Sequence, residues 1–181
     1  MRNETKTPVK WTKKRVVKVV LLAHLLLLLL SGCSAIQRQP QAEDMEALLT
    51  EHRESIETVL DYLLAESKSY ILIEDTSGTM LTGTATSPLS DTAIEKTEVL
   101  DCVKELFEAG CRSITKDLQS NAVVFEFWHR SSGSVSCGIV YAADGETTPA
   151  VEFLTKREPL REDGWYFYQA DYEQWRIDQS K

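Results

Sequence analysis

The sequence predicts an α+β domain, in which two N-terminal helices pack on one antiparallel sheet of about four to five strands. Two observations support this prediction. Up to about residue 110, apolar residues recur at intervals of three and four, the spacing of an amphipathic helix. From Arg112 onward, apolar and polar residues alternate, which is the spacing of a half-buried strand. Helices followed by a run of strands are typical of helices packed on one face of an antiparallel sheet.

The first helix is expected from Glu43 to Glu66, where aliphatic residues form one face and acidic residues the other. We interpret the acidic face as solvated. A second helix is expected to begin near Ser90 or Asp91, since small polar side chains there cap free backbone amides. It is expected to end at Gly110, because glycine readily takes the left-handed conformation at the end of a helix.

We identify strands as stretches in which apolar and polar residues alternate and which are bounded by turn residues. We expect them at Tyr70–Glu74, Val123–Arg130, Val135–Tyr141, Ala150–Thr155 and Trp165–Ala170. A turn is expected at Ser132–Gly133, and Thr79–Thr84 forms either a further strand or a loop. This order of elements resembles a cone of the cystatin-like or nuclear-transport-factor-2-like kind. The resemblance concerns the fold alone and implies no activity.

The N-terminus has the three parts of an export signal. Seven basic residues and one acid precede Val19, and the segment Val19–Leu30 is apolar apart from His24. Positive charge holds this end on the cytoplasmic side and directs the rest of the chain outward. Twelve residues are too few to span a bilayer as a helix, which takes about 20, and fit the core of a secretory signal.

The apolar run ends in Leu30-Ser31-Gly32-Cys33, which resembles the lipobox of bacterial lipoproteins. The resemblance implies a diacylglyceryl thioether on Cys33 and cleavage just before it. Residues 1–32 are then a signal peptide, 33–41 the lipidated cysteine and a short linker, and 42–181 a single extracytoplasmic domain. The alternative is an uncleaved signal anchor from Val19 to Ile36. The predicted location is the cell membrane, with the lipid-anchored domain facing the extracytoplasmic side.

The charge of the predicted mature part excludes one class of partner. Of the 20 Lys and Arg and the 28 Asp and Glu, seven and one precede Cys33, which leaves 13 against 27 and a formal net charge of −14. Nucleic-acid binding needs a basic face, so nucleic acid is not an expected partner. Anionic headgroups repel such a body, so the lipid on Cys33 is the expected attachment to the membrane. No glycine-rich phosphate loop occurs, and no cofactor is predicted.

The cysteines left after Cys33 are Cys102, Cys111 and Cys137, an odd number for an exported domain. Cys102 lies on the apolar face of the second predicted helix, and Cys137 alternates with apolar residues on a predicted strand. Both are therefore expected to point inward, either as small core residues or as a Cys102–Cys137 disulfide. No metal site is predicted, because no familiar ligand spacing occurs.

Two sets of residues are candidates for a site. His52 and His129 are the only histidines outside the predicted signal, and either could serve as a base in a small enzyme with a pocket in a curved sheet. The other set is aromatic. Tyr166 and Tyr168 face away from Trp165 and Phe167, and Trp128 with Glu126 is expected on the same side as the two tyrosines. The expected contact residues are therefore Trp128, Glu126, Tyr166 and Tyr168.

The sequence therefore favours a non-catalytic binding or accessory module of the cell envelope, with an envelope protein or a glycan as its ligand. The small enzyme with His52 or His129 as base is the alternative. The aromatic residues have an alternative too, in which helices or the C-terminal segment cover both faces of their strand.

Overall fold

The computed structural model describes residues 38–84, 86–116, 122–130, 134–142 and 151–180. The predicted signal peptide, Cys33 and the predicted turn at Ser132–Gly133 lie outside the described residues. Residues from Gln39 to Lys181 form one compact unit. Within the described ranges, no helix is long and apolar enough to cross a membrane.

The α+β class is confirmed, with four helices and one open antiparallel sheet of eight strands in the described residues. This is more strands than the sequence predicted. The helices are α2 (Ala42–Glu51), α3 (Arg53–Ala65), α4 (Thr97–Glu108) and α5 (Tyr172–Gln179). The strands are β1 (Tyr70–Ile73), β2 (Thr79–Thr84), β3 (Ser87–Ala93), β4 (Ser113–Lys116), β5 (Val123–His129), β6 (Val135–Tyr141), β7 (Leu154–Pro159) and β8 (Trp165–Asp171). Their order across the sheet is β3-β2-β1-β4-β5-β6-β8-β7.

The single N-terminal helix expected over Glu43–Glu66 is two helices. The chain leaves helical geometry at His52, where φ is −108° and ψ is 24°, and resumes it at Arg53. The apolar stripe continues through the break, because Leu49 before it and Ile56 after it are both fully buried. The bend lets α2 contact β6 and β8 while α3 lies against α4.

The expected start of the second helix is wrong. Residues near Ser90 belong to strand β3, which pairs with β2, and α4 begins only at Thr97. A hydroxyl contact of 2.9 Å between Thr82 and Thr92 reinforces this pairing. Residues with hydroxyl side chains can cap a helix, and they can also occupy an exposed edge strand. Here pairing with β2 makes the segment a strand. The helix end is confirmed, since Gly110 has a φ of +103°.

The C-terminal part agrees with the sequence in one strand and differs in two elements. Strand β8 lies where Trp165–Ala170 was expected, but β7 begins at Leu154 rather than near Ala150. Helix α5 was not predicted. Its first turn is capped by Asp171, whose Oδ1 accepts a hydrogen bond of 3.0 Å from the amide of Gln174.

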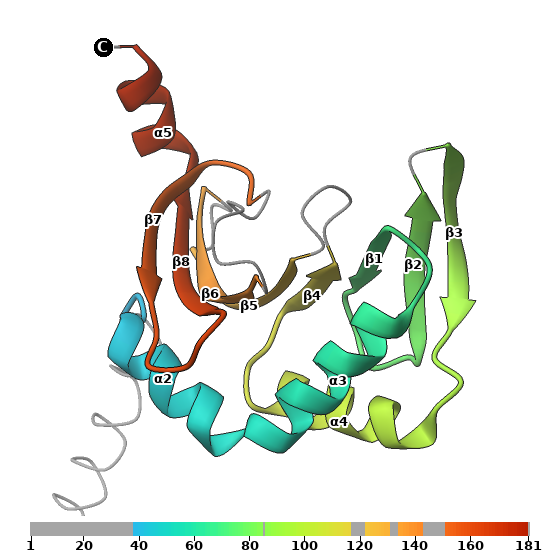
Figure 1. Ribbon diagram of the computed structural model, residues 1–181. Coiled ribbons are helices and arrows are strands. Elements are labelled where there is room, and N and C mark those ends of the chain that lie inside the picture. The colour runs from blue at the N-terminus through green and yellow to red at the C-terminus, as the bar shows by residue number, and fades with distance from the viewer. Residues whose placement is uncertain (1–37, 85, 117–121, 131–133, 143–150, 181) are drawn as a thin grey trace, which may run out of the picture. The chain divides into compact units, whose positions relative to one another are not determined.

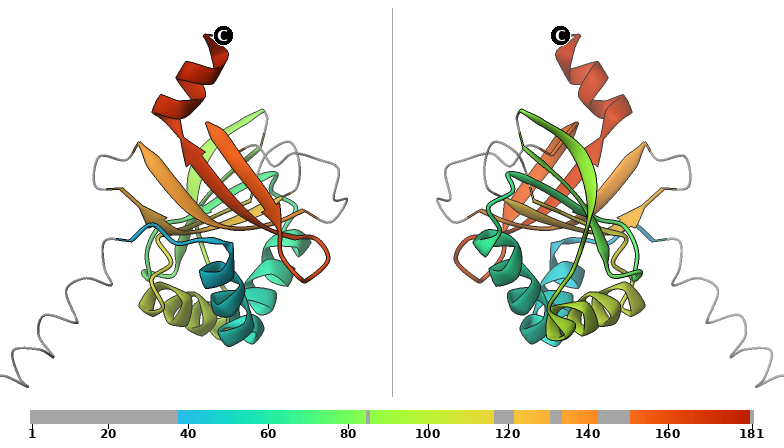
Figure 2. Two further views of the ribbon diagram at one scale, coloured as in Figure 1. Left: turned by 90° about the vertical axis from the view of Figure 1, so that its left-hand side faces the viewer. Right: turned by 90° about the vertical axis from the view of Figure 1, so that its right-hand side faces the viewer.

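Helices α2, α3 and α4 all lie on one side of the sheet, which we call the helix-side face (Figures 1 and 2). The largest core cluster fills the space between them, with Ile71, Phe125 and Phe167 from the strands and Leu49 and Leu63 from the helices. We call the opposite side of the sheet the open face. A smaller buried cluster lies there, formed by Ala122, Val140, Ala142, Tyr168 and Ala170.

One buried charge lies on the helix-side face among the described residues. Lys116 is 4% exposed, and its ammonium donates hydrogen bonds of 2.9 Å to the carbonyl oxygens of Leu63 and Glu66. These carbonyls belong to the end of α3, where backbone acceptors lack helical partners and a cation is favourable. Burial lowers the pKa of Lys116, and the carboxylate of Glu66 opposes that shift. Lys116 thus joins β4 to the end of α3.

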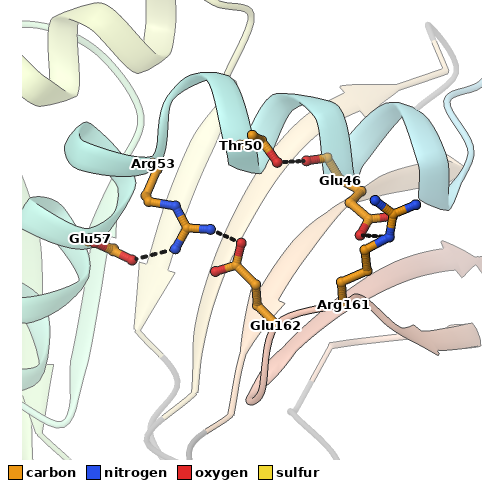
Figure 3. Close-up of polar contacts among 6 residues, drawn as sticks. All are labelled: Glu46, Thr50, Arg53, Glu57, Arg161 and Glu162. Carbon is orange, nitrogen blue, oxygen red and sulfur yellow. Dashed lines mark hydrogen bonds and ion pairs between the residues drawn. The ribbon is translucent and has the colours of Figure 1, made fainter.

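The turn between β7 and β8 is held against the helices by ion pairs (Figure 3). The guanidinium of Arg53 bridges Glu162 of the turn and Glu57 of its own helix. Arg161 forms an ion pair with Glu46, in which Nε lies 3.0 Å from Oε1. Exposed pairs of this kind contribute about 0–1 kcal/mol each, so they orient the turn more than they stabilise the domain.

Candidate functional site

A β-bulge in β5 decides which side chains reach the open face. Glu126 pairs with Gly138 and Trp128 with Cys137, so Phe127 is the extra residue of the bulge. Cys137 belongs to the helix-side core, and Trp128 opposite it packs against the same core. The expectation that Trp128 shares a face with the two tyrosines is therefore wrong, because the bulge reverses the alternation after Glu126.

The same bulge brings a histidine to the open face. His129 pairs with Ser136, whose side chain lines the open face, and the Nδ1 of His129 lies 2.9 Å from Oε1 of Glu126. Without the bulge, residues three apart on a strand point to opposite faces. His129 and Glu126 were both candidates from the sequence, but only the structure shows that they contact each other. His52, the other candidate base, lies on the helix side of the sheet and contacts Glu105 on α4.

Glu126 lines a groove on the open face, with a volume of about 510 Å³. We call it the open-face groove. It is formed by Tyr70, Ser113, Thr115, Val124, Glu126, Ser134, Ser136, Val151, Glu152, Phe153, Tyr168, Ala170 and Tyr172. Its volume is in the range of small-ligand sites, about 300–1,000 Å³.

Tyr168 lies in the wall of this groove and is almost fully buried, with 2% of its surface exposed. Burial raises the pKa of Tyr168 well above its ordinary value, and the nearby carboxylate of Glu126 raises it further. A hydrogen bond with Ser136 acts in the opposite direction. The phenol is therefore a neutral hydrogen-bonding group, and the charge at this part of the groove comes from Glu126.

One end of the groove is aromatic. The ring of Phe153 lies 4.9 Å from that of Tyr172 and 5.3 Å from that of Trp175, both with edge-to-face geometry. Phe153 has a φ of +59°, unusual for a side chain of this size, and its carbonyl accepts a hydrogen bond of 2.9 Å from the amide of Asp171. Tyr172 and Trp175 remain 46% and 36% exposed. The strained turn thus holds aromatic surface in solvent beside the groove.

Tyr166 lies on the open face, as the sequence predicted, but outside the groove. It packs against the small cluster around Tyr168, and the guanidinium of Arg157 lies 3.8 Å from the centre of its ring. The stacked guanidinium covers one side of the ring. Of the four aromatic and acidic contact residues expected, Glu126 and Tyr168 therefore lie together in the groove, and Tyr166 and Trp128 do not.

A second hollow, of about 590 Å³, lies between α3 and α4. We call it the acidic hollow, because Glu51, Glu54, Glu98, Asp101 and Glu105 line it together with His52, Ser55, Thr58 and Cys102. His52 Nδ1 and Ser55 Oγ both contact the carboxylate of Glu105, at 2.9 and 2.7 Å. These hydrogen bonds lower the pKa of Glu105, that from His52 most.

The order of groups in the acidic hollow is not that of a Ser-His-Asp triad. In a Ser-His-Asp triad the histidine is the immediate partner of the serine, and the carboxylate lies behind the histidine. Here the carboxylate of Glu105 lies between Ser55 and His52, and the serine hydroxyl donates to it. The arrangement links α3 to α4 and differs from a triad in the order of its groups.

The three described cysteines are free thiols, so the structure does not contain the Cys102–Cys137 disulfide. Cys137 and Cys111 are buried, and burial raises the pKa of each thiol to about 12. Cys102 is half-buried and packs at the margin of the main core. They correspond to the small core residues that were one of the two interpretations of the sequence.

Several groove residues were not singled out from the sequence. Ser136 occupies an outward position of β6, whose inward positions are apolar, so strict alternation contained a signal for it. Ser113 and Thr115 occupy the outward positions of β4, where the signal is weaker because the inward residues are Ile114 and Lys116. Phe153, Glu152 and Tyr172 lie outside regular strands. They reach the groove only because of the backbone geometry before β7 and after β8, and the sequence contains no comparable signal for them.

In the part of the chain that the structure describes, no group of three or more potential metal ligands is clustered. Comparisons with known protein families, with curated proteins and with solved structures find no match to this chain.

Proposed function

We propose that this chain is a lipid-anchored extracytoplasmic protein whose domain acts as a non-catalytic binding or accessory module of the cell envelope. The observation that carries the binding part is the open-face groove. It combines hydroxyl groups, the two carboxylates of Glu126 and Glu152, and the exposed aromatic end at Phe153 and Tyr172. Concave surfaces with a few convergent polar groups and aromatic edges are the usual form of ligand sites.

The anchor is proposed from Leu30-Ser31-Gly32-Cys33 and the export signal before it. Helix α2 begins at Ala42, so about nine residues, at most about 30 Å when extended, would join the lipid to the domain. In cells, Cys33→Ser should abolish lipid labelling and leave an unprocessed precursor. Normal processing of that variant would contradict the anchor proposal. The likeness to a cystatin-like or nuclear-transport-factor-2-like cone is likewise a proposal about fold only.

The groove is tested by photocrosslinking in intact cells. A photoreactive amino acid replaces Thr115, which lines the open-face groove, and in a matched variant it replaces Asp101, which is exposed on α4. We expect an adduct of discrete mass from position 115 and none from position 101. Equal adducts from both positions, or an adduct from position 101 alone, would contradict the proposal.

A second candidate function is a small enzyme that uses His129 as a base, favoured by the contact of 2.9 Å between His129 and Glu126. His129→Gln separates the two functions. A binding module captures a ligand of unchanged mass at position 115 with this substitution, even where the amount captured falls. If the protein is an enzyme, the wild type captures product, whereas His129→Gln lacks the base and captures unreacted substrate. The mass of the adduct would then differ between the two.

A further inference from the structure

The charge of the open-face groove is of one sign. Two of its described lining residues, Glu126 and Glu152, are acidic, and none of the described lining residues is basic. The remaining polar groups are hydroxyls, which accept hydrogen bonds as readily as they donate them. A ligand of negative charge would meet uncompensated repulsion there. The groove is therefore complementary to positive charge.

The groove is long as well as acidic. Its lining residues come from the neighbouring strands β1, β4, β5, β6 and β8, and from the segment before β7. The five strands are separated by four intervals of about 4.8 Å, so the groove extends about 19 Å across the strands of the sheet. An extended peptide advances about 3.4 Å per residue, so five or six residues span this length. A compact amine would occupy only a part of it.

The aromatic end suits the same charge. Tyr172 lines the groove and is 46% exposed, and Trp175 beside Phe153 is 36% exposed. The faces of such rings attract ammonium and guanidinium groups. Long basic side chains can also lay their methylene stems along aromatic surface while their charged ends reach a carboxylate.

We propose that the open-face groove binds an extended peptide segment rich in Lys or Arg, presented by a protein of the envelope. In this arrangement Glu126 and Glu152 pair with basic side chains, and Tyr172 receives one on its ring face. His129 acts as a positioning residue, because its Nδ1 holds one carboxylate oxygen of Glu126. The inference rests on the proposed binding function and adds the chemical class of the ligand.

The test is a titration of the purified full-length chain with octalysine at about 150 mM salt, followed by tryptophan fluorescence or calorimetry. The groove variant is Glu126→Gln with Glu152→Gln. The matched control is Glu51→Gln with Glu54→Gln, which removes the same charge from the acidic hollow. We expect the groove variant to weaken octalysine binding at least tenfold and the control less than twofold. Tyr172→Leu should weaken it several-fold while preserving apolar surface.

Equal weakening by both pairs would overturn the proposal, since attraction to an acidic body would then explain binding. Absence of octalysine binding by the folded wild type, or binding of the neutral maltohexaose that is unchanged in the groove variant, would also overturn it. Photocrosslinking tests the proposed binding function independently of the charge of the ligand. If photocrosslinking from position 115 persists in the groove variant, the open face is a ligand surface and only the cationic class is wrong.

Discussion

The two faces of the sheet are built from the same strands and differ in what lies against them. On the helix-side face, Ile114, Phe125 and Ile139 have no exposed surface and pack against three helices. On the open face of the same strands, Thr115, Glu126 and Ser136 line a groove. Period-two alternation separates the two sets along each strand. One face thus supplies stability, and the other leaves polar groups available for a ligand.

The two hollows on the domain differ in a similar way. The acidic hollow between α3 and α4 is the larger, yet its histidine and serine both bond to Glu105 and so are satisfied within the hollow. The open-face groove has an exposed aromatic end and lies on a wall formed by several strands. The comparison favours the groove as the ligand site and assigns the contacts of the acidic hollow to helix packing.

The largest expected difference concerns thiol reactivity. In the Cys33→Ser chain at about pH 8, the half-buried Cys102 should react with a disulfide reagent orders of magnitude faster than the buried Cys111 and Cys137. The reason is that burial raises the pKa of both slow thiols to about 12, and the thiolate is the reactive form. Mass spectrometry of the labelled peptides measures this. Rapid labelling of Cys137, or a Cys102–Cys137 disulfide in the isolated protein, would contradict the buried assignment.

Phe125→Ala should lower the free energy of unfolding by about 3–5 kcal/mol, because it opens a cavity where the helix-side core has no exposed surface. Thr115→Ala on the neighbouring strand is the matched control on the open face, and it should cost less than about 1 kcal/mol. Denaturant titration of the two variants measures both values. Similar losses from the two would mean that the faces do not differ in their contribution to stability.

Lys116→Met should cost about 1–3 kcal/mol, since it leaves the carbonyls of Leu63 and Glu66 without their donor. The control is Lys104→Met, which removes only an exposed pair with Asp101 and should cost about 0–1 kcal/mol. Both are read from denaturant midpoints. A neutral result for Lys116→Met would show that relief from burying the charge offsets the lost hydrogen bonds, and that Lys116 does not hold the end of α3.

The smallest expected effect lies in the acidic hollow. The folded pKa of Glu105 is lowered by its contacts with His52 and Ser55, so its contribution to stability is present above its ordinary pKa and lost as pH falls through the folded value. Glu105→Gln should therefore flatten the loss of stability below about pH 5 by a few tenths of a kcal/mol, since the carboxylate is exposed. If the free energy of unfolding falls with pH identically in wild type and variant, the contacts of Glu105 do not contribute to stability.

The sequence predicted the class of the fold and the direction of most side chains on β5, β6 and β8, because alternation depends only on local geometry. It missed β3 and placed a helix start there, because Ser90 and Asp91 suit both a cap and an edge strand. It also failed at Trp128 and His129. A bulge changes the pairing partner of each residue after it, and that depends on the facing strand β6 rather than on β5 itself.

The candidate site was predictable to a similar degree. Glu126 and Tyr168 were expected contact residues, and they lie in the groove. Phe153 and Tyr172, which form its aromatic end, depend on a left-handed turn residue before β7 and on the unpredicted helix α5. Neither feature has a periodic signal, so the end of the groove is determined by tertiary contacts only.

The most direct test of the open face as a ligand surface is hydroxyl-radical footprinting of the protein on intact cells and after purification. Tyr172 in the groove and Leu89 on edge strand β3 are similarly exposed, at 46% and 54%, and serve as a matched pair. We expect modification of Tyr172 and Phe153 to be several-fold lower on cells than in the purified protein, and modification of Leu89 to be unchanged. Equal protection of Leu89 and Tyr172, or no protection of Tyr172, would contradict a ligand in the open-face groove.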